Sequence, residues 1–225
     1  MMESDIKKNL TAYKKSLHAS APFDELSFFP KVKEILLKNR GSNILEIGCG
    51  RGAFFEMVKA IRSDLAMNFS AVDLDDFLRP EIRNEVNFVK VNMSTEKLPF
   101  DDSSFDYICG FAVLEHVENP WNFVREVHRV LKPGGHLLLS FPTGKDIFSR
   151  LKYLFTGELY AFTYDNGHIA VFTESTQKKL FRGFKLVDLF CPKFPVPLIN
   201  SPKLRMPGKP FFANKRLHIY RKKSS

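Results

Sequence analysis

Residues that could bind a nucleoside cofactor follow the first strongly apolar stretch of the chain. Asn43–Ile47 is followed by three closely spaced glycines, Gly48, Gly50 and Gly52. Glycine has no Cβ and tolerates positive φ, so a ligand can lie against the backbone there, and the helix that follows presents free N–H groups. Asp73 ends the next apolar stretch, 23 residues after Gly50, and its carboxylate could accept both ribose hydroxyls. Together these residues predict a site for a nucleoside-containing cofactor.

The same glycines also satisfy a loose dinucleotide fingerprint, Gly48-x-Gly50-x-x-Ala53, so a nicotinamide-dependent oxidoreductase is an alternative. Two features count against it. Glu46 places a carboxylate where a pyrophosphate would be repelled and a cationic amino group attracted. The chain also contains no Tyr-x-x-x-Lys sequence, which supplies the acid of one common dehydrogenase class. A cofactor with a positively charged amino group is therefore favoured.

The elements that would position these residues alternate along the middle of the chain. Short stretches rich in Val, Ile, Leu and Phe are typical of strands buried on both faces, and stretches with helical apolar spacing lie between them. The alternation predicts an α/β fold with a parallel sheet covered on both sides. The expected strands are Asn43–Ile47, Phe69–Asp73, Asn87–Val91, Phe105–Gly110, His136–Phe141, Phe184–Phe190 and Leu217–Tyr220. The expected helices are Lys31–Lys38, Gly52–Arg62, Pro120–Leu131 (ended by Lys132–Gly135) and Glu174–Phe181.

Residues 1–225 are interpreted as a single domain with three additions to this alternation. Within 1–30, Asp5–Leu17 has the spacing of an amphipathic helix that could form a lid. Residues 144–168 form an insert rich in aromatic side chains, which could cover a substrate. Residues 191–225 are basic and rich in proline, which disfavours regular structure before the final expected strand.

The excess of positive charge is confined to the C-terminal segment. The chain carries 34 Lys and Arg against 25 Asp and Glu, and the nine surplus cations all lie in Leu189–Ser225, which has no acidic residue. Such a segment could contact an anionic membrane, a nucleic acid or solvent alone. The three cysteines are far apart, and the chain shows neither a membrane-spanning apolar run nor a secretory signal, so we expect a cytoplasmic protein.

Over Asn43–Pro142 the sequence resembles the class I S-adenosylmethionine-dependent methyltransferases, in the group that includes the ubiquinone-biosynthesis O-methyltransferases and many small-molecule enzymes. Five blocks carry the resemblance in the order and spacing of the family: Leu45–Gly52, Val72–Leu74, Leu98–Asp106, Val113–Val117 and Arg129–Gly135. The resemblance implies a three-layer, doubly wound, Rossmann-like fold with a seven-stranded, mostly parallel sheet whose last strand is antiparallel. It also implies S-adenosyl-L-methionine as the cofactor.

Carried over residue by residue, the resemblance places the methionine part of this cofactor against the glycine-rich turn. The residues involved would be Gly48, Cys49, Gly50 and Gly52. Glu46 would lie near the amino group of the methionine, whose positive charge its carboxylate would attract.

The nucleoside part would contact residues from the following loops, namely Asp73, Leu74, Asn92, Met93 and Phe111. Asp73 would hold the ribose, and Phe111, after the fourth strand, would close the pocket. The family usually has an aspartate in the adenine loop. In this chain Asn92 stands near that position, with Ser94 as the rival alignment.

Methyl transfer from a sulfonium is an in-line displacement, so the enzyme mainly has to align nucleophile, methyl and sulfur in a dry site. A hydroxyl acceptor also benefits from a base. The residues expected to act in catalysis are His116, as that base, with Glu115 and His168. Tyr160, Tyr164 and Asp165 are further candidates.

Some relatives bind a divalent cation through a Glu-x-x-Glu-His sequence and a later histidine. Glu115, His116 and His168 match this pattern, but Ala112 occupies the position of the first glutamate. One carboxylate and two imidazoles could bind a transition metal but would hold Mg²⁺ poorly. We therefore expect no metal, and a merely structural Glu115–His116 pair is an alternative to a catalytic one.

The chemical class of the methyl acceptor is limited mainly by motifs that the sequence lacks. No Asn/Asp-Pro-Pro-Tyr sequence follows the fourth strand and no cysteine follows a proline, which counts against methylation of adenine or glutamine nitrogen and of cytosine carbon. The aromatic insert favours a hydrophobic or ring-bearing acceptor. We expect a small-molecule or lipid-linked acceptor, methylated at oxygen, with contact to an anionic membrane. The alternatives are an RNA 2′-O-methyltransferase and a non-catalytic cofactor-binding module that acts through its basic C-terminus.

Overall fold

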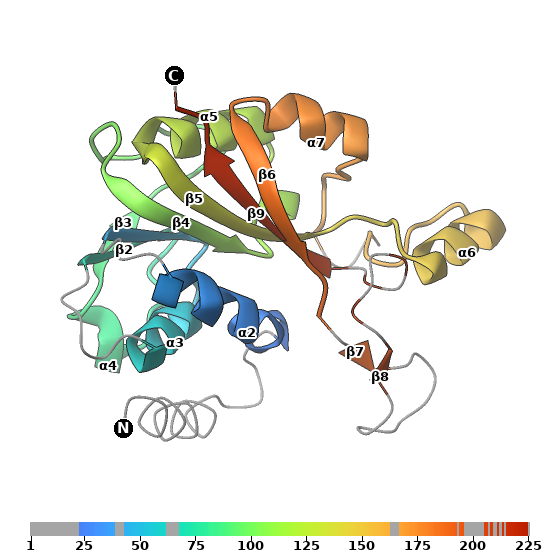
Figure 1. The fold of residues 1–225 in the computed structure, drawn as a ribbon, viewed down its shortest axis with the longest axis horizontal. Coiled ribbons are helices and arrows are strands. Elements are labelled where there is room, and N and C mark those ends of the chain that lie inside the picture. Colours follow the sequence, from blue (N-terminus) through green and yellow to red (C-terminus); the bar gives the residue numbers. More distant parts are fainter. Residues whose placement is uncertain are drawn as a thin grey trace.

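A seven-stranded sheet runs through the centre of the computed structural model (Figure 1). The structure describes residues 23–38, 43–61, 68–162, 167–192, 194–195, 205–206, 208, 211, 213 and 215–224. The strand order is β3-β2-β1-β4-β5-β9-β6. Strand β9 pairs antiparallel with both β5 and β6, and the remaining pairings in this sheet are parallel. The expected doubly wound sheet with its last strand antiparallel is confirmed.

The strand bounds are close to those expected from the apolar stretches. They are β1 Asn43–Ile47, β2 Asn68–Asp73, β3 Asn87–Lys90, β4 Phe105–Phe111, β5 Leu131–Pro142, β6 Phe184–Phe190 and β9 Lys215–Lys222. Two short strands, β7 Phe194–Pro195 and β8 Arg205–Met206, pair with each other outside the main sheet.

Helices cover both faces of the sheet, with α2, α3 and α4 on one side and α5 and α7 on the other (Figure 1). The bounds are α2 Phe23–Lys38, α3 Ala53–Ile61, α4 Pro80–Arg83, α5 Pro120–Val130, α6 Ile147–Thr156 and α7 Glu174–Leu180. Each face has its own apolar core: Ile44 of β1 packs with Phe54 of α3, whereas Leu45 packs with Phe123 of α5. Successive strand side chains point to opposite faces, so one apolar strand supplies both cores.

Helix α2 begins at Phe23, earlier than the expected Lys31, and contains Pro30. Proline disfavours a helix interior because it lacks an N–H and clashes with the preceding turn. In this helix Phe28 and Val32, on either side of the proline, are both fully buried in the same core. Tertiary packing therefore stabilises the helix on both sides of the proline.

Strand β5 also begins earlier than expected, at Leu131, directly after helix α5 ends at Val130. The Lys132–Gly135 segment was expected only to stop the helix, but it lies within the strand, where the pairing with β4 shifts register. Gly134 takes a φ of +75°, and its carbonyl accepts a hydrogen bond from Arg221 Nε of β9 at 3.1 Å. The helix thus ends before these glycines, which lie in the irregular part of the strand.

Several cations of the basic C-terminal segment are used inside the fold. Besides Arg221, Lys222 Nζ donates to the Leu131 carbonyl and Lys223 Nζ to the Arg182 carbonyl, each at 2.7 Å. These basic side chains therefore stabilise the packing of β9 against its neighbours through hydrogen bonds to backbone carbonyls. The expected helix Asp5–Leu17, and most of Cys191–Pro210, lie outside the described residues.

Helix α6 lies within the aromatic insert and projects beyond the end of the sheet (Figure 1). Asp146 caps its first turn by accepting from the Ser149 N–H at 2.9 Å, and Gly157, with φ +73°, ends it in a left-handed conformation. Among the described residues, no helix is both long enough and apolar enough to cross a membrane.

Candidate functional site

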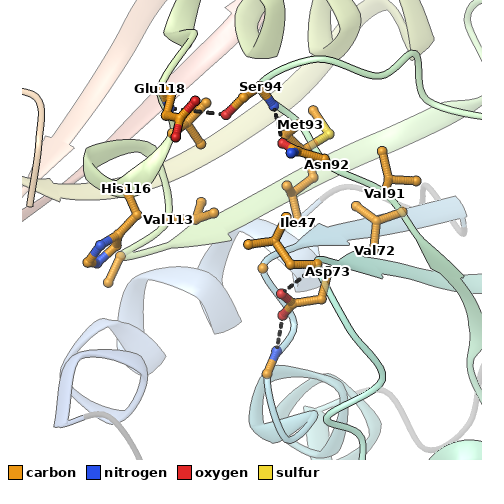
Figure 2. Close-up of a pocket in the computed structure, with 15 residues that line it drawn as sticks. Ile47, Val72, Asp73, Val91, Asn92, Met93, Ser94, Val113, His116 and Glu118 are labelled. Atoms are coloured by element: carbon orange, nitrogen blue, oxygen red, sulfur yellow. Dashed lines mark hydrogen bonds between the residues drawn. The ribbon is translucent and has the colours of Figure 1, made fainter. Parts of the chain in front are cut away.

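A cavity of about 330 Å³ opens where strands β1, β2 and β4 end, as expected for the ligand site of a doubly wound sheet (Figure 2). Its walls come from the glycine-rich turn after β1, the end of β2, the loop after β3 and the segment after β4. The lining residues are Ile47, Gly48, Gly50, Val72, Asp73, Leu74, Val91, Asn92, Met93, Ser94, Ala112, Val113, His116, Val117 and Glu118.

The glycine-rich turn needs glycine for two different reasons. All three glycines have positive φ, +72° at Gly48, +48° at Gly50 and +79° at Gly52. A Cβ at Gly48 would lie 2.8 Å from Val113 Cγ2, and one at Gly52 would overlap Cδ1 of Ile82. A Cβ at Gly50 would meet no atom within 4 Å, because this residue faces the cavity. Gly48 and Gly52 therefore permit close packing, whereas Gly50 leaves room for a ligand.

Asp73 joins the end of β2 to the glycine-rich turn. Its Oδ2 accepts a hydrogen bond from the Gly50 N–H at 2.8 Å, and its Oδ1 accepts one from the Leu74 N–H at 2.7 Å (Figure 2). Each carboxylate oxygen keeps a further lone pair for a hydroxyl donor. The two backbone bonds fix the carboxylate at the cavity wall, where it could hold the two hydroxyls of a ribose.

The adenine side of the predicted site is formed by Leu74, which is 60% exposed, and by Asn92 and Met93. The Asn92 side-chain oxygen accepts from the Ser94 N–H at 2.9 Å, so its amide is held by its own loop. The Ser94 hydroxyl in turn accepts from the Glu118 N–H at 3.0 Å (Figure 2). Both alternatives for the adenine contact, Asn92 and Ser94, line the same cavity.

The other predicted cofactor residues lie away from the lining. Glu46 and Cys49 are buried, and burial together with the nearby Glu46 carboxylate raises the pKa of the Cys49 thiol. Phe111 was expected to close the pocket, but its ring packs in the core between Phe28 and Phe54, with centroids 6.2 and 5.0 Å away. Their roles in cofactor binding remain predictions.

The predicted catalytic residues come together at the edge of the cavity. The 3₁₀ helix η1, Leu114–His116, carries Glu115 and His116, and the Glu115 carbonyl accepts from the Ile169 N–H at 2.9 Å and from the Ala170 N–H at 3.3 Å. This backbone pairing brings His168 beside His116, with ring centroids 4.8 Å apart. His168 Nε2 lies 3.9 Å from Oε1 of Glu115, whose side chain is fully buried. His116 alone of the three lines the cavity.

Both histidines are oriented by backbone carbonyls. His116 Nδ1 lies 2.9 Å from the Gly167 oxygen, and His168 Nδ1 bonds the Ala161 oxygen. A carbonyl oxygen can only accept, so each Nδ1 carries the hydrogen and each neutral ring keeps its lone pair on Nε2. Burial lowers the pKa of His168 below its usual value of 6.5, and the neighbouring His116 adds to this. His168 is therefore neutral near pH 7.

This cluster could also hold a metal ion. One donor atom from each of Glu115, His116 and His168 lies within 4.8 Å of the other two. Imidazole nitrogen suits transition metals, whereas Mg²⁺ prefers oxygen ligands. Ala112, where relatives carry a glutamate, adds no side-chain oxygen and takes a φ of +53°. The donor set of these described residues thus fits proton transfer or a transition metal better than Mg²⁺.

Sequence reasoning missed Val113, Val117 and Glu118 as parts of the cavity wall. Val113 also packs on the glycine-rich turn, so Gly48 and Val113 constrain each other. A signal was available, since these residues follow directly after the fourth expected strand, whose end meets the same edge of the sheet as Asp73.

A family model described as a methyltransferase domain matches residues 19–189, which is most of the chain. The chain belongs to this methyltransferase domain family. The family and the fold together imply S-adenosyl-L-methionine as its cofactor, and the open space at Gly50 beside the Asp73 carboxylate fits such a ligand. The expected family, fold class and cofactor are thus confirmed.

The relatives and solved structures agree with this assignment. A mitochondrial ubiquinone biosynthesis O-methyltransferase of Dictyostelium discoideum is 29% identical over 56% of the chain and 46% of its own length. A Mycolicibacterium smegmatis protein, named a "probable S-adenosylmethionine-dependent methyltransferase", is 33% identical over 45% of the chain and 38% of its own length. The chain thus spans less than half the length of these two relatives. An S-adenosylmethionine-dependent methyltransferase of Mesorhizobium loti shares the fold, with a TM-score of 0.59 at 18% identity over 87% of this chain and 98% of that one.

Proposed function

We propose that this methyltransferase acts on a hydroxyl oxygen of a small-molecule or lipid-linked acceptor. The observation that supports this most directly is His116, which stands at the cavity edge with its Nε2 lone pair available. Of the usual acceptors, a hydroxyl gains most from a base beside it, because it must lose its proton as it attacks. The O-methyltransferase of ubiquinone biosynthesis among the relatives supports the same choice.

The residues of the site have separate tasks in this proposal. The backbone of Gly48 and Gly50 and the Asp73 carboxylate hold the cofactor, and they align it with the acceptor. When bound, S-adenosylmethionine supplies the methyl group from its sulfonium. His116 Nε2 takes the hydroxyl proton of the acceptor, while the Gly167 carbonyl keeps Nδ1 protonated and the ring oriented.

Glu115 and His168 then act as positioning residues. The resulting His116 imidazolium would lie beside His168, whose low pKa keeps it neutral and avoids two adjacent cations. Glu115 is a carboxylate buried next to this pair, and its negative charge would stabilise the positive charge that develops on the imidazoles.

A lipid-linked acceptor is supported by the exposed surface of α6. Leu154 is 75% exposed and Phe155 is 82% exposed, and both lie on a capped helix that stands away from the sheet (Figure 1). Arg150 and Lys152 belong to the same helix. Apolar side chains with flanking cations are typical of helices that rest on anionic membranes. We propose that α6 contacts such a membrane and so brings the enzyme to its acceptor.

Methyl transfer tests the first proposal. The protein is incubated with methyl-labelled S-adenosylmethionine and a matched series of ring compounds that carry a hydroxyl, an amine or a thiol. We expect label in the methyl ether, and a rate about 100-fold lower or more in His116→Gln with cofactor affinity unchanged. His136→Gln, on strand β5 away from the cavity, is the control and should keep the rate. Label in the amine alone, label in the thiol alone, or full activity of His116→Gln contradicts the proposal.

Vesicles test the membrane contact. Leu154→Ser should slow methylation of a polyprenylated phenol in phosphatidylglycerol vesicles but leave a water-soluble phenol unaffected. Leu37→Ser makes the same change on α2, where the leucine is 43% exposed, and should affect neither substrate. Equal effects of the two variants on the vesicle-bound phenol would contradict a specific role for α6.

A further inference from the structure

A second cavity, of about 580 Å³, lies at the far edge of the sheet between helix α7 and strands β6 and β9. Among the described residues, it shares no lining residue with the cofactor cavity. Alternate residues of β9 and residues three or four apart on α7 face it, as the two periodicities require. The lining residues are Lys145, Glu174, Gln177, Lys178, Phe181, Arg182, Phe184, Leu186, Leu189, Arg216, His218, Tyr220 and Lys223.

The floor of this cavity is apolar and recessed. Phe181, Phe184 and Tyr220 stack or pack edge-to-face on one another, and each is at most 5% exposed. Leu186 lines the same cavity but is 48% exposed. The reason is that α7 has only seven residues, too few to cover the edge strand β6 and its neighbour β9 along their length. The volume falls within the range of about 300–1,000 Å³ that small-molecule sites occupy.

The walls are strongly basic, with five cations against one acid. That acid, Glu174, lies 3.1 Å from Lys178 and 3.7 Å from Lys145, so the charge at their end of the cavity is partly neutralised. At the other end, Arg182 is exposed and forms no ion pair with any residue that the structure describes, and Lys223 lies beside it. Arg182 and Lys223 therefore place two positive charges together at this end of the cavity.

We propose that this cavity binds one molecule of an amphipathic organic anion. Its carboxylate or phosphate head meets Arg182 and Lys223, and its apolar chain lies along Leu186 and the aromatic floor. An inorganic anion would leave the apolar floor unused. A flat bilayer could not reach the recessed rings, so the ligand enters as a single molecule. The site is separate from methyl transfer and does not depend on the acceptor proposed above.

Calorimetric titration with octyl phosphate tests this proposal. We expect saturable binding of one molecule per chain, and we expect octanol and inorganic phosphate each to bind at least about tenfold more weakly, since each lacks one half of the interaction. Arg182→Glu should weaken octyl phosphate binding about tenfold or more by reversing a charge at the head. Leu186→Gln should also weaken it, and because Leu186 is half exposed this variant should fold normally.

Lys179→Glu provides the matched control, because Lys179 lies near the end of α7, three residues before Arg182, is exposed and does not line the cavity. It should leave octyl phosphate binding unchanged, and S-adenosylmethionine binding should be unaffected in all three variants. If Lys179→Glu and Arg182→Glu weaken octyl phosphate binding equally, the loss comes from the overall charge of the protein, and the proposal is overturned. So would equal binding of inorganic phosphate, or binding to phosphatidylglycerol vesicles or an acidic peptide without binding to octyl phosphate.

Discussion

Gly50 and Gly157 offer a matched pair that separates backbone strain from loss of the cofactor site. Both residues have positive φ, +48° and +73°, and at both a Cβ would meet no atom within 4 Å. Gly50 lines the cofactor cavity, whereas Gly157 only ends helix α6. Substitution by alanine therefore imposes the same kind of backbone strain at the two positions but places a methyl group in the cavity at only one.

The expected magnitudes follow from this difference. A non-glycine residue in the left-handed region costs about 1–2 kcal/mol, so both variants should lose about that much unfolding free energy. In Gly50→Ala the new methyl also competes with the cofactor for the turn. Overpacking of a fitted site costs about 1–3 kcal/mol, which corresponds to a fall in S-adenosylmethionine affinity of about 5- to 150-fold.

Two measurements on each variant check this reasoning. Urea unfolding gives the stability loss, and calorimetric titration with S-adenosylmethionine gives the affinity. We expect similar unfolding free energies in the two variants and an affinity loss only in Gly50→Ala. A role for Gly50 in the cofactor site is refuted if Gly50→Ala binds the cofactor as tightly as the wild type, or if Gly157→Ala loses as much affinity.

Three further substitutions test other parts of the structure. Asp73→Asn leaves one oxygen to accept two backbone N–H groups and removes the charge, so the affinity for S-adenosylmethionine should fall about tenfold or more. The control Asp75→Asn, at an exposed carboxylate, should bind the cofactor normally. Burial lowers the pKa of His218 from 6.5 to about 4, so the unfolded chain takes up a proton that the folded chain does not, and stability should fall by about 3 kcal/mol as pH drops through this interval. Urea unfolding of His218→Gln should lack this part of the acid sensitivity, and an unchanged pH dependence would exclude it. Arg129 donates hydrogen bonds to Glu126, Asp102 and the carbonyls of Leu98 and Phe100. Arg129→Lys should therefore lose about 2 kcal/mol of unfolding free energy, whereas Arg125→Lys, at an exposed arginine, should change it little. Equal losses in the two variants would contradict a stabilising role for the Arg129 network.

The interior strands could be predicted because a strand that is buried on both faces is a continuous apolar stretch in the sequence. Asn43–Ile47 was predicted with the observed bounds for this reason, and so was Phe184–Phe190, although this edge strand has mostly exposed residues. The errors occurred where tertiary packing overrides a local signal. Pro30 lies inside a helix because Phe28 and Val32 are buried together, and Gly134 lies inside a strand because Arg221 of a distant strand bonds its carbonyl.

The two sites differ in how much of them a sequence can reveal. Gly50 and Asp73 could be paired in advance because parallel strands end at the same edge of the sheet. The proximity of His168 to His116 could be expected from family resemblance alone, because it depends on backbone bonds between two segments far apart in the chain. The basic cavity beside α7 was not foreseen, since its residues come mainly from three separate elements and no contiguous motif marks them.

Strand β9 lies late in the chain yet occupies an interior place in the sheet, between β5 and β6. During synthesis from the N-terminus, β6 emerges before the strand that must hold it, and β5 meanwhile presents a long unpaired edge. The final architecture can therefore close only after Lys215–Lys222 has left the ribosome. A nascent chain stalled before Lys215 would contain the glycine-rich turn and Asp73 but would leave this edge of β5 without its partner strand, open to pairing with another chain.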